Sequence, residues 1–135
     1  IVGGGLNAAL RIAAEGLRFQ PICVEVDDPS PFLAAADVYL SACAVESFGL
    51  ANLEAVAAGL PCVVARGGGA SEVLVGGAWL IDPTVENFAQ ALCQLVDQQV
   101  LRASWAEAAR NRKAQIPTWE QLVLHYERTI AGDNA

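Results

Sequence analysis

Residues 46–65 have the sequence ESFGLANLEAVAAGLPCVVA, and this stretch is the most informative part of the chain for its fold. The loop that carries Glu46 leads into a helix predicted over residues 50–58, which Gly59 ends. Residues 62–65 are an unbroken apolar run, which predicts a strand of the kind that a parallel sheet buries on both faces. A helix followed by such a strand predicts an α/β fold.

The same alternation of helices and strands continues on both sides of this stretch. Periodic apolar positions predict strands ending near residue 2 and over residues 18–26, 38–40 and 79–81, and helices over residues 6–17, 32–36, 71–74, 85–96, 100–113 and from 119 onward. The helix after residue 84 carries one apolar stripe, formed by Val85, Phe88, Ala89, Leu92 and Val96. Thr118 and Gln121 fit a capping box before the last helix. We therefore expect a mainly parallel sheet with helices on both faces.

The composition restricts the class of protein. Apolar residues make up 54% of the 135 residues and charged residues 17%, which favours one globular domain with a buried core. The net charge of −7 and the eight scattered Lys and Arg argue against a nucleic-acid partner and against docking on an anionic membrane. No apolar run reaches the roughly 18–20 residues that a membrane span needs, so we expect no transmembrane segment.

The cysteines and the N-terminus add two expectations. Cys23, Cys43, Cys62 and Cys93 form no CxxC pair, so we expect neither zinc nor redox chemistry, and reduced thiols of a cytoplasmic protein fit best. Cys23 and Cys62 lie in strand-like runs and are expected to be small buried hydrophobes. The chain begins at Ile1 and contains no Met, so we expect it to begin inside a longer gene product.

Glu46 and Glu54 are the strongest candidates for a binding site. Seven residues separate the two carboxylates, and a helix is predicted to begin between them. Free main-chain N–H groups near Phe48, Gly49 and Leu50 would point out of the helix N-terminus, where they bind anions and sugar hydroxyls. A carboxylate accepts two hydrogen bonds from a vicinal diol such as a ribose. The structural alternative is that both acids only favour the helix start through its dipole.

The wider sequence resembles the C-terminal domain of retaining glycosyltransferases with the GT-B fold, especially glycosyltransferase family 4. The signature of that family, a Glu-x7-Glu motif of the form EGFGLxxxEAxAxGxPVV, is similar to residues 46–64. Its other landmarks, in the same order, resemble residues 1–5 (IVGGG), 28–38 (DPSPFLAAADV), 68–72 (GGASE), 81–83 (IDP) and 117–120 (PTWE). The resemblance implies the Rossmann-like C-terminal half of a GT-B enzyme, truncated at its N-terminus by at least one strand and helix.

The resemblance also implies a ligand and the residues that bind it. A nucleoside diphosphate sugar, such as a UDP- or GDP-sugar, would be the substrate, with no cofactor and no metal. Glu46 would be the catalytic residue that orients the donor sugar, and Glu54 would hold the ribose hydroxyls. The other residues implied in donor binding are Gly3, Gly4, Gly5, Ser47, Phe48, Gly49, Leu50, Gly68 and Gly69.

By the same resemblance, residues 1–135 are a single partial domain. The Arg and Lys that neutralise the diphosphate in the family, and its whole acceptor-binding domain, would lie before Ile1. A sugar, lipid or other acceptor would bind that N-terminal domain, and any membrane association would be made there. The full-length enzyme would transfer a hexose with retention of configuration, and the 135-residue chain alone would be inactive.

Three alternatives stay open. Residues 3–8 fit GxGxxA and Glu25 follows in a predicted strand, which is the fingerprint of a Rossmann oxidoreductase that binds FAD or NAD; this hypothesis leaves residues 46–64 unexplained. A related GT-B enzyme, such as a sugar-nucleotide epimerase or a phosphorylase, is the second alternative. The third is a non-catalytic domain that binds a sugar nucleotide, and no feature of the sequence separates it from an active enzyme.

Overall fold

The computed structural model of the chain describes Ile22 and residues 24–132, which belong to two units, residues 1–36 and residues 37–135. In the first unit, α2 (Ser30–Ala35) begins two residues before the predicted helix at 32–36, and the carboxylate of Asp28 accepts a hydrogen bond of 2.9 Å from the N–H of Ser30 beside its start. The strand predicted over residues 18–26 is not seen in its described part, where Val24 forms a single bridge. The predicted strand end near residue 2 and the predicted helix at 6–17 lie outside the described residues.

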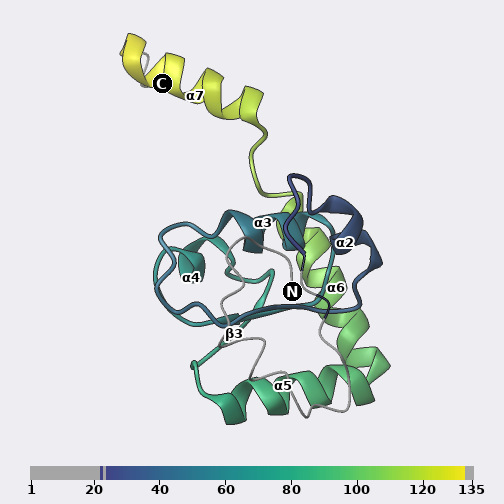
Figure 1. Ribbon diagram of the computed structural model, residues 1–135. Helices are drawn as coiled ribbons and strands as arrows, with labels where there is room; N and C mark the ends of the chain where they lie inside the picture. Colours follow the sequence, from purple (N-terminus) through teal and green to yellow (C-terminus); the bar gives the residue numbers. More distant parts are fainter. Residues whose placement is uncertain (1–21, 23, 133–135) are drawn as a thin grey trace. The chain divides into compact units, whose positions relative to one another are not determined.

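The second unit contains a parallel sheet in the order β1-β2-β3. Its strands are β1 (Tyr39–Ser41), β2 (Cys62–Ala65) and β3 (Trp79–Ile81). All four residues of β2 are buried, because β2 has a strand on each side and helices above and below it (Figure 1). The parallel arrangement and the bounds of β2 and β3 confirm the sequence prediction, whereas β1 begins one residue later than predicted.

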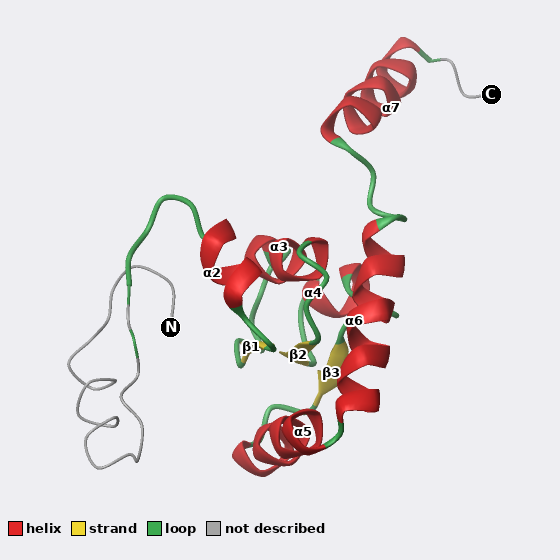
Figure 2. Cartoon of the chain, turned by 90° about the vertical axis from the view of Figure 1, so that its right-hand side faces the viewer, coloured by secondary structure: helices red, strands yellow, loops and turns green. Residues whose placement is uncertain are grey.

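Four helices pack around this sheet: α3 (Leu50–Ala57), α4 (Ala70–Val73), α5 (Val85–Asp97) and α6 (Gln99–Lys113). Helices α3 and α4 lie on one side of the sheet and α5 lies on the other (Figure 1). Helix α6 contacts both α3 and α5, and it runs beside β3 (Figure 2). The prediction of helices on both faces is therefore confirmed. Gly59 ends α3 as predicted, because its φ of +77° is a conformation that glycine adopts without steric cost.

The core between the sheet and α5 is built from Val63, Ile81, Ala91 and Leu95. Beside it, the indole rings of Trp79 and Trp105 stack with their centroids 5.7 Å apart and their planes inclined by 8°. The apolar stripe predicted for α5 is buried only in part: Phe88 packs against this core, whereas Val85 is 80% exposed and Val96 is 68% exposed. The buried residues of the helix are Ala91 and Leu95, whose spacing of four residues places them one turn apart on the same side of the helix.

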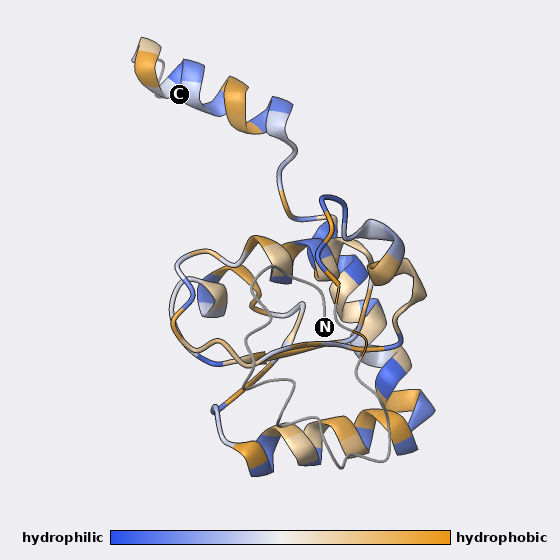
Figure 3. Ribbon diagram, in the orientation of Figure 1, coloured by the Kyte–Doolittle hydropathy of each residue, from blue (hydrophilic) through white to orange (hydrophobic). Residues whose placement is uncertain are grey.

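Helix α7 (Trp119–Ala131) begins with the predicted capping box. The N–H of Gln121 donates to the hydroxyl oxygen of Thr118, and the N–H of Thr118 donates to the side-chain oxygen of Gln121. Apolar and polar residues alternate along this helix (Figure 3), and none of its residues is buried. Among the described residues, no helix combines the length and the apolar character that crossing a membrane requires.

Candidate functional site

The start of α3 leaves several main-chain donors unused. Gly49 is the N-cap residue, and no side chain caps the helix. The first helical hydrogen bond runs from the N–H of Leu53 to the carbonyl of Gly49 at 3.0 Å. Within the described part of the chain, nothing accepts a hydrogen bond from the N–H groups of Leu50, Ala51 and Asn52. The helix start therefore presents free donors and the positive end of the helix dipole.

Gly49 is required at this position for two reasons. Its φ of +84° is a conformation that side chains with a Cβ rarely adopt. A Cβ at this position would also lie 2.7 Å from Nδ2 of Asn52 and 3.2 Å from Cγ of Glu46. The absence of a side chain therefore lets the Glu46 loop turn tightly into α3 and keeps the space between Glu46 and Asn52 free.

The loop that carries Glu46 is held by the glycine-rich loop after β2. The N–H of Gly69 donates a hydrogen bond of 3.0 Å to the carbonyl oxygen of Glu46. A Cβ at Gly67 would overlap the carbonyl oxygen of Ala44, and a Cβ at Gly68 would overlap that of Glu46. A Cβ at Gly69 would overlap the carbonyl oxygen of Ser47 in the same way. Three consecutive glycines therefore pack backbone against backbone on this loop.

Glu46 is half-buried in its loop, and Glu54 is exposed about one turn inside α3. Both carboxylates act on the same neighbour, Tyr39 of β1. Burial raises the pKa of Tyr39 to about 12; a hydrogen bond from the Ser41 side chain opposes this rise, and electrostatic interactions with Cys62, Glu54 and Glu46 add to it. The two glutamates therefore lie close to one side chain of the sheet.

The structure brings together most of the residues that the sequence indicated. Glu46, Ser47, Gly49, Gly68 and Gly69 form one contiguous cluster at the start of α3. Phe48 and Leu50 beside this cluster are 49% and 62% exposed, so their apolar side chains are open to a ligand. Gly3, Gly4 and Gly5 lie outside the described residues.

Two residues of this region were not predicted. The Tyr39 hydroxyl donates a hydrogen bond of 2.9 Å to Oδ1 of Asn52, which is only 2% exposed. The signal in the sequence was the spacing of Asn52, Ala55 and Val56, the residues of α3 that are buried. An asparagine on an otherwise apolar helix face indicates a buried hydrogen bond, because a polar group inside a protein needs a partner.

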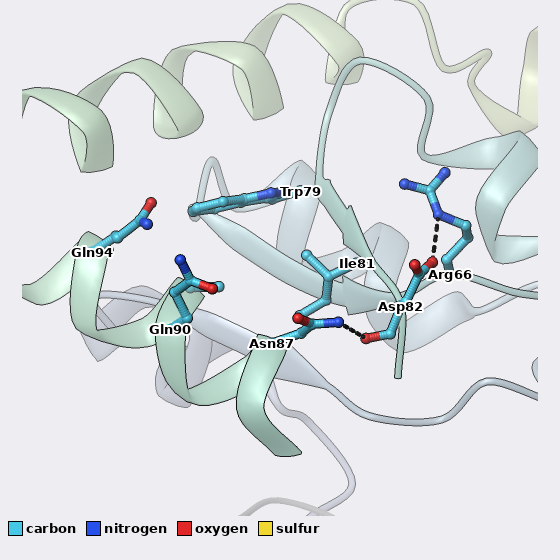
Figure 4. A pocket seen from close by; sticks show the side chains of 8 residues that line it. Arg66, Trp79, Ile81, Asp82, Asn87, Gln90 and Gln94 are labelled. Atoms are coloured by element: carbon cyan, nitrogen blue, oxygen red, sulfur yellow. Dashed lines mark hydrogen bonds and ion pairs between the residues drawn. The ribbon is translucent and has the colours of Figure 1, made fainter. Parts of the chain in front are cut away.

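A hollow of about 270 Å³ lies elsewhere in the second unit, between β3 and α5 (Figure 4). The Arg66 and Asp82 side chains at one end of it form an exposed ion pair with Nε and Oδ1 3.2 Å apart. Nδ2 of Asn87 donates to the main-chain carbonyl of Asp82 at 3.1 Å. None of the predicted site residues lines this hollow, whose lining residues are Arg66, Trp79, Ile81, Asp82, Asn87, Gln90, Ala91 and Gln94. We therefore place the candidate site at the start of α3.

Solved structures define the class to which this fold belongs. The structure of Alr3699/HepE from Anabaena in complex with UDP matches 91% of this chain and 34% of its own, with a TM-score of 0.77 and 22% identity. The C-terminal domain of the group 1 glycosyl transferase LpcC from Francisella tularensis matches 79% of this chain and 58% of its own, with a TM-score of 0.66 and 24% identity. The fold is that of the C-terminal domain of a GT-B glycosyltransferase.

The family follows from the sequence match. The family "Glycosyl transferases group 1" matches residues 15–112, which is more than half of the chain and includes the whole Glu46–Glu54 motif. The chain therefore belongs to the group 1 glycosyl transferases, as its motif indicated.

Curated relatives differ in what their names say they act on. Sucrose-phosphate synthase of Zea mays is 33% identical over 116 residues, covering 80% of this chain and 11% of the relative. A GDP-mannose-dependent phosphatidylinositol dimannoside mannosyltransferase of Mycobacterium tuberculosis is 31% identical over 132 residues, covering 96% of this chain and 34% of the relative. N-acetyl-alpha-D-glucosaminyl L-malate synthase of Bacillus anthracis is 34% identical over 104 residues, covering 75% of this chain and 27% of the relative. The chain thus spans between 11% and 34% of the length of these relatives.

Proposed function

We propose that this chain is the donor-binding domain of a retaining hexosyltransferase and that it binds a nucleoside diphosphate sugar at the start of α3. The observation that carries the proposal is the uncapped N-terminus of this helix, which lies between Glu46 in the preceding loop and Glu54 one turn inside. The family assignment supports it, and so do the solved structure with UDP and the relative that uses GDP-mannose.

Each part of the site has a role in this proposal. The free N–H groups of Leu50 and Ala51 donate to the diphosphate, which the helix dipole also stabilises. The Glu54 carboxylate accepts hydrogen bonds from the ribose hydroxyls. Glu46 orients the donor sugar and does not act as a general acid. The rate enhancement then comes from positioning and from stabilisation of the departing diphosphate and the oxocarbenium-like sugar.

Substitution of the two glutamates tests these roles in the full-length protein that contains this chain. Glu46→Ala should reduce turnover severely while nucleotide binding survives. Glu54→Ala should weaken nucleotide affinity by about 1–3 kcal/mol, the cost of losing a charged hydrogen bond. Glu86→Ala is the matched control, because Glu86 is an exposed acid in the first turn of α5. Activity and affinity that are unchanged in both variants would reject the site assignment.

Titration with different nucleotides tests the ligand class and the alternatives. We expect a UDP-, GDP- or ADP-sugar to bind, as followed by isothermal titration calorimetry. Binding of NAD or FAD without binding of any sugar nucleotide would favour the oxidoreductase hypothesis. Sugar-nucleotide binding without transfer to any acceptor would favour the non-catalytic domain, and epimerisation or phosphorolysis of a bound sugar would favour the related GT-B enzymes.

The domain organisation is part of the proposal. The relatives are at least about three times as long as the matched region, so an N-terminal domain would supply the acceptor site, the cationic groups for the diphosphate and any membrane association. We place the enzyme in the cytoplasm, which the three free thiols among the described cysteines support. The 135-residue chain alone should bind the donor weakly and catalyse nothing, because an exposed helix terminus contributes only about 0.3–1 kcal/mol toward an anion. Turnover by the purified chain would contradict this organisation.

A further inference from the structure

Asn52 is the buried polar side chain of the described core, and the oxygen of its amide group has a hydrogen-bond partner. Its Oδ1 accepts a hydrogen bond of 2.9 Å from the Tyr39 hydroxyl. Because burial keeps Tyr39 neutral up to a pKa of about 12, this hydroxyl remains a donor throughout the physiological range. In the structure this hydrogen bond places the Asn52 oxygen toward Tyr39 and the NH2 group away from it.

The NH2 group of Asn52 faces the Glu46 side chain across Gly49. Nδ2 of Asn52 lies 2.7 Å, and Cγ of Glu46 lies 3.2 Å, from the one point that a Cβ of Gly49 would occupy. Glycine leaves this point empty, so the amide and the Glu46 side chain border the same small space. The amide donor and the carboxylate acceptor are complementary in charge and in hydrogen-bonding capacity.

This NH2 group has no partner in the part of the chain that the structure describes. No hydrogen bond is formed by Nδ2, although the whole residue is only 2% exposed. Every fully enclosed side-chain nitrogen or oxygen atom of the described residues has a hydrogen-bond partner. Because Nδ2 of Asn52 has none, it is not fully enclosed, and it lies at the margin of the core, where it can reach the site. Packing alone would favour an apolar residue at this position of α3, because Ala55 and Val56 complete the buried face.

We propose that Asn52 is a positioning residue that donates a hydrogen bond to the Glu46 carboxylate when the donor sugar is bound, with Tyr39 holding the amide in the required orientation. This inference rests on the proposed role of Glu46 and deepens it. Without this donor the Glu46 side chain would be free to rotate, because the bond from Gly69 and the packing of the glycine-rich loop act on its main chain. A donor on the core side of the carboxylate restricts it to one rotamer and leaves its other oxygen for the sugar.

The first test is a double-mutant cycle in the full-length transferase. Asn52→Leu, which keeps the branching at Cγ and removes the amide, should reduce kcat at least about tenfold while the affinity for the free nucleoside diphosphate changes by less than about twofold. Tyr39→Phe, which removes only a hydroxyl, should reduce kcat by a smaller factor. In a Glu46→Ala background, Asn52→Leu should change the remaining turnover by less than about twofold. The same fold loss in both backgrounds, or an equal loss of nucleotide affinity, would overturn the proposal.

The second test does not depend on glycosyl transfer. In the full-length protein, the side-chain NH2 signals of Asn52, assigned by their loss in Asn52→Leu, should shift when a sugar nucleotide is added to the wild type. In Glu46→Ala, which keeps nucleotide binding under the proposed function, this shift should be much smaller. The NH2 signals of Asn111, which is exposed on α6, serve as the internal control. An equal Asn52 shift in both proteins would disprove the contact, whereas a wild-type protein that binds no sugar nucleotide would reject the proposed function itself.

Discussion

The main-chain N–H of Gly69 donates a hydrogen bond of 3.0 Å to the carbonyl oxygen of Glu46. This bond joins the loop after β2 to the loop before α3, and the packing of the glycine backbone against Ala44, Glu46 and Ser47 extends it on both sides. The position of the Glu46 carboxylate therefore depends on residues more than twenty positions further along the chain. Substitutions in the glycine-rich loop are therefore expected to disturb the Glu46 loop through these contacts.

Gly69→Ala should displace the Glu46 loop. The φ of Gly69 is −65°, so alanine carries no conformational penalty there and would ordinarily stabilise the chain by about 0.4–1 kcal/mol. Its Cβ would however overlap the carbonyl oxygen of Ser47. We expect a loss of about 1–3 kcal/mol in the free energy of unfolding, as in other overpacked positions, together with NMR shift changes at residues 44–48.

Gly76→Ala is the matched control for that substitution. The φ of Gly76 is +77°, and no atom lies within 4 Å of the position that its Cβ would occupy. It should cost about 1–2 kcal/mol through the backbone conformation alone and leave the shifts of residues 44–48 unchanged. If Gly69→Ala stabilised the chain, the packing of the two loops described above would be wrong.

Leu95→Ala should destabilise the second unit strongly. Leu95 is fully buried in the cluster of Val63, Ile81 and Ala91. Truncation leaves a cavity between α5 and the sheet, which should lower the free energy of unfolding by about 2–5 kcal/mol in urea denaturation. The neighbouring Val96→Ala is the control, because Val96 is 68% exposed and its truncation should change stability by no more than about 0.5 kcal/mol. Equal effects would contradict the burial of Leu95 against the sheet.

Stability should fall as the pH rises from about 10 to 12. Burial raises the pKa of Tyr39 from 10.0 to about 12, so the folded chain retains the proton of this hydroxyl more tightly than the unfolded chain does. The resulting stabilisation is complete below pH 10 and is lost as the pH rises through 12. Urea denaturation of Tyr39→Phe should show a smaller decline across this window than that of the wild type. An unchanged decline would mean that the hydroxyl is not buried.

Cys62 should resist thiol reagents in the folded chain. It is fully buried in β2, and burial raises its pKa to about 12, so very little reactive thiolate is present at pH 8. Cys43 and Cys93 are exposed free thiols and should be alkylated readily under the same conditions. Peptide mapping after brief treatment with iodoacetamide, with and without urea, measures the difference. Modification of Cys62 at the rate of Cys93 without urea would place β2 at the surface.

The sequence predicted those elements whose signal is local. The apolar run was sufficient to predict β2, and the glycines at the two ends of α3 were sufficient to predict that helix. Both predictions succeed because strand burial and helix termination act over a few residues. The capping box of α7 was predicted for the same reason. The buried face of α5 was predicted only in part: Phe88 of the predicted stripe packs against the core, but only the position of the sheet selects Ala91 and Leu95 over Val85 and Val96.

For the site, the sequence by itself determined the family, the two glutamates and the helix start between them, because this motif lies within nine consecutive residues, 46–54. Only the tertiary structure decided that the glycine-rich loop holds the backbone of Glu46 and that Tyr39 holds the amide of Asn52. These contacts join residues on different strands, loops and helices. Their distances depend on how β1, β2 and α3 pack together, and no periodicity in the sequence carries that information.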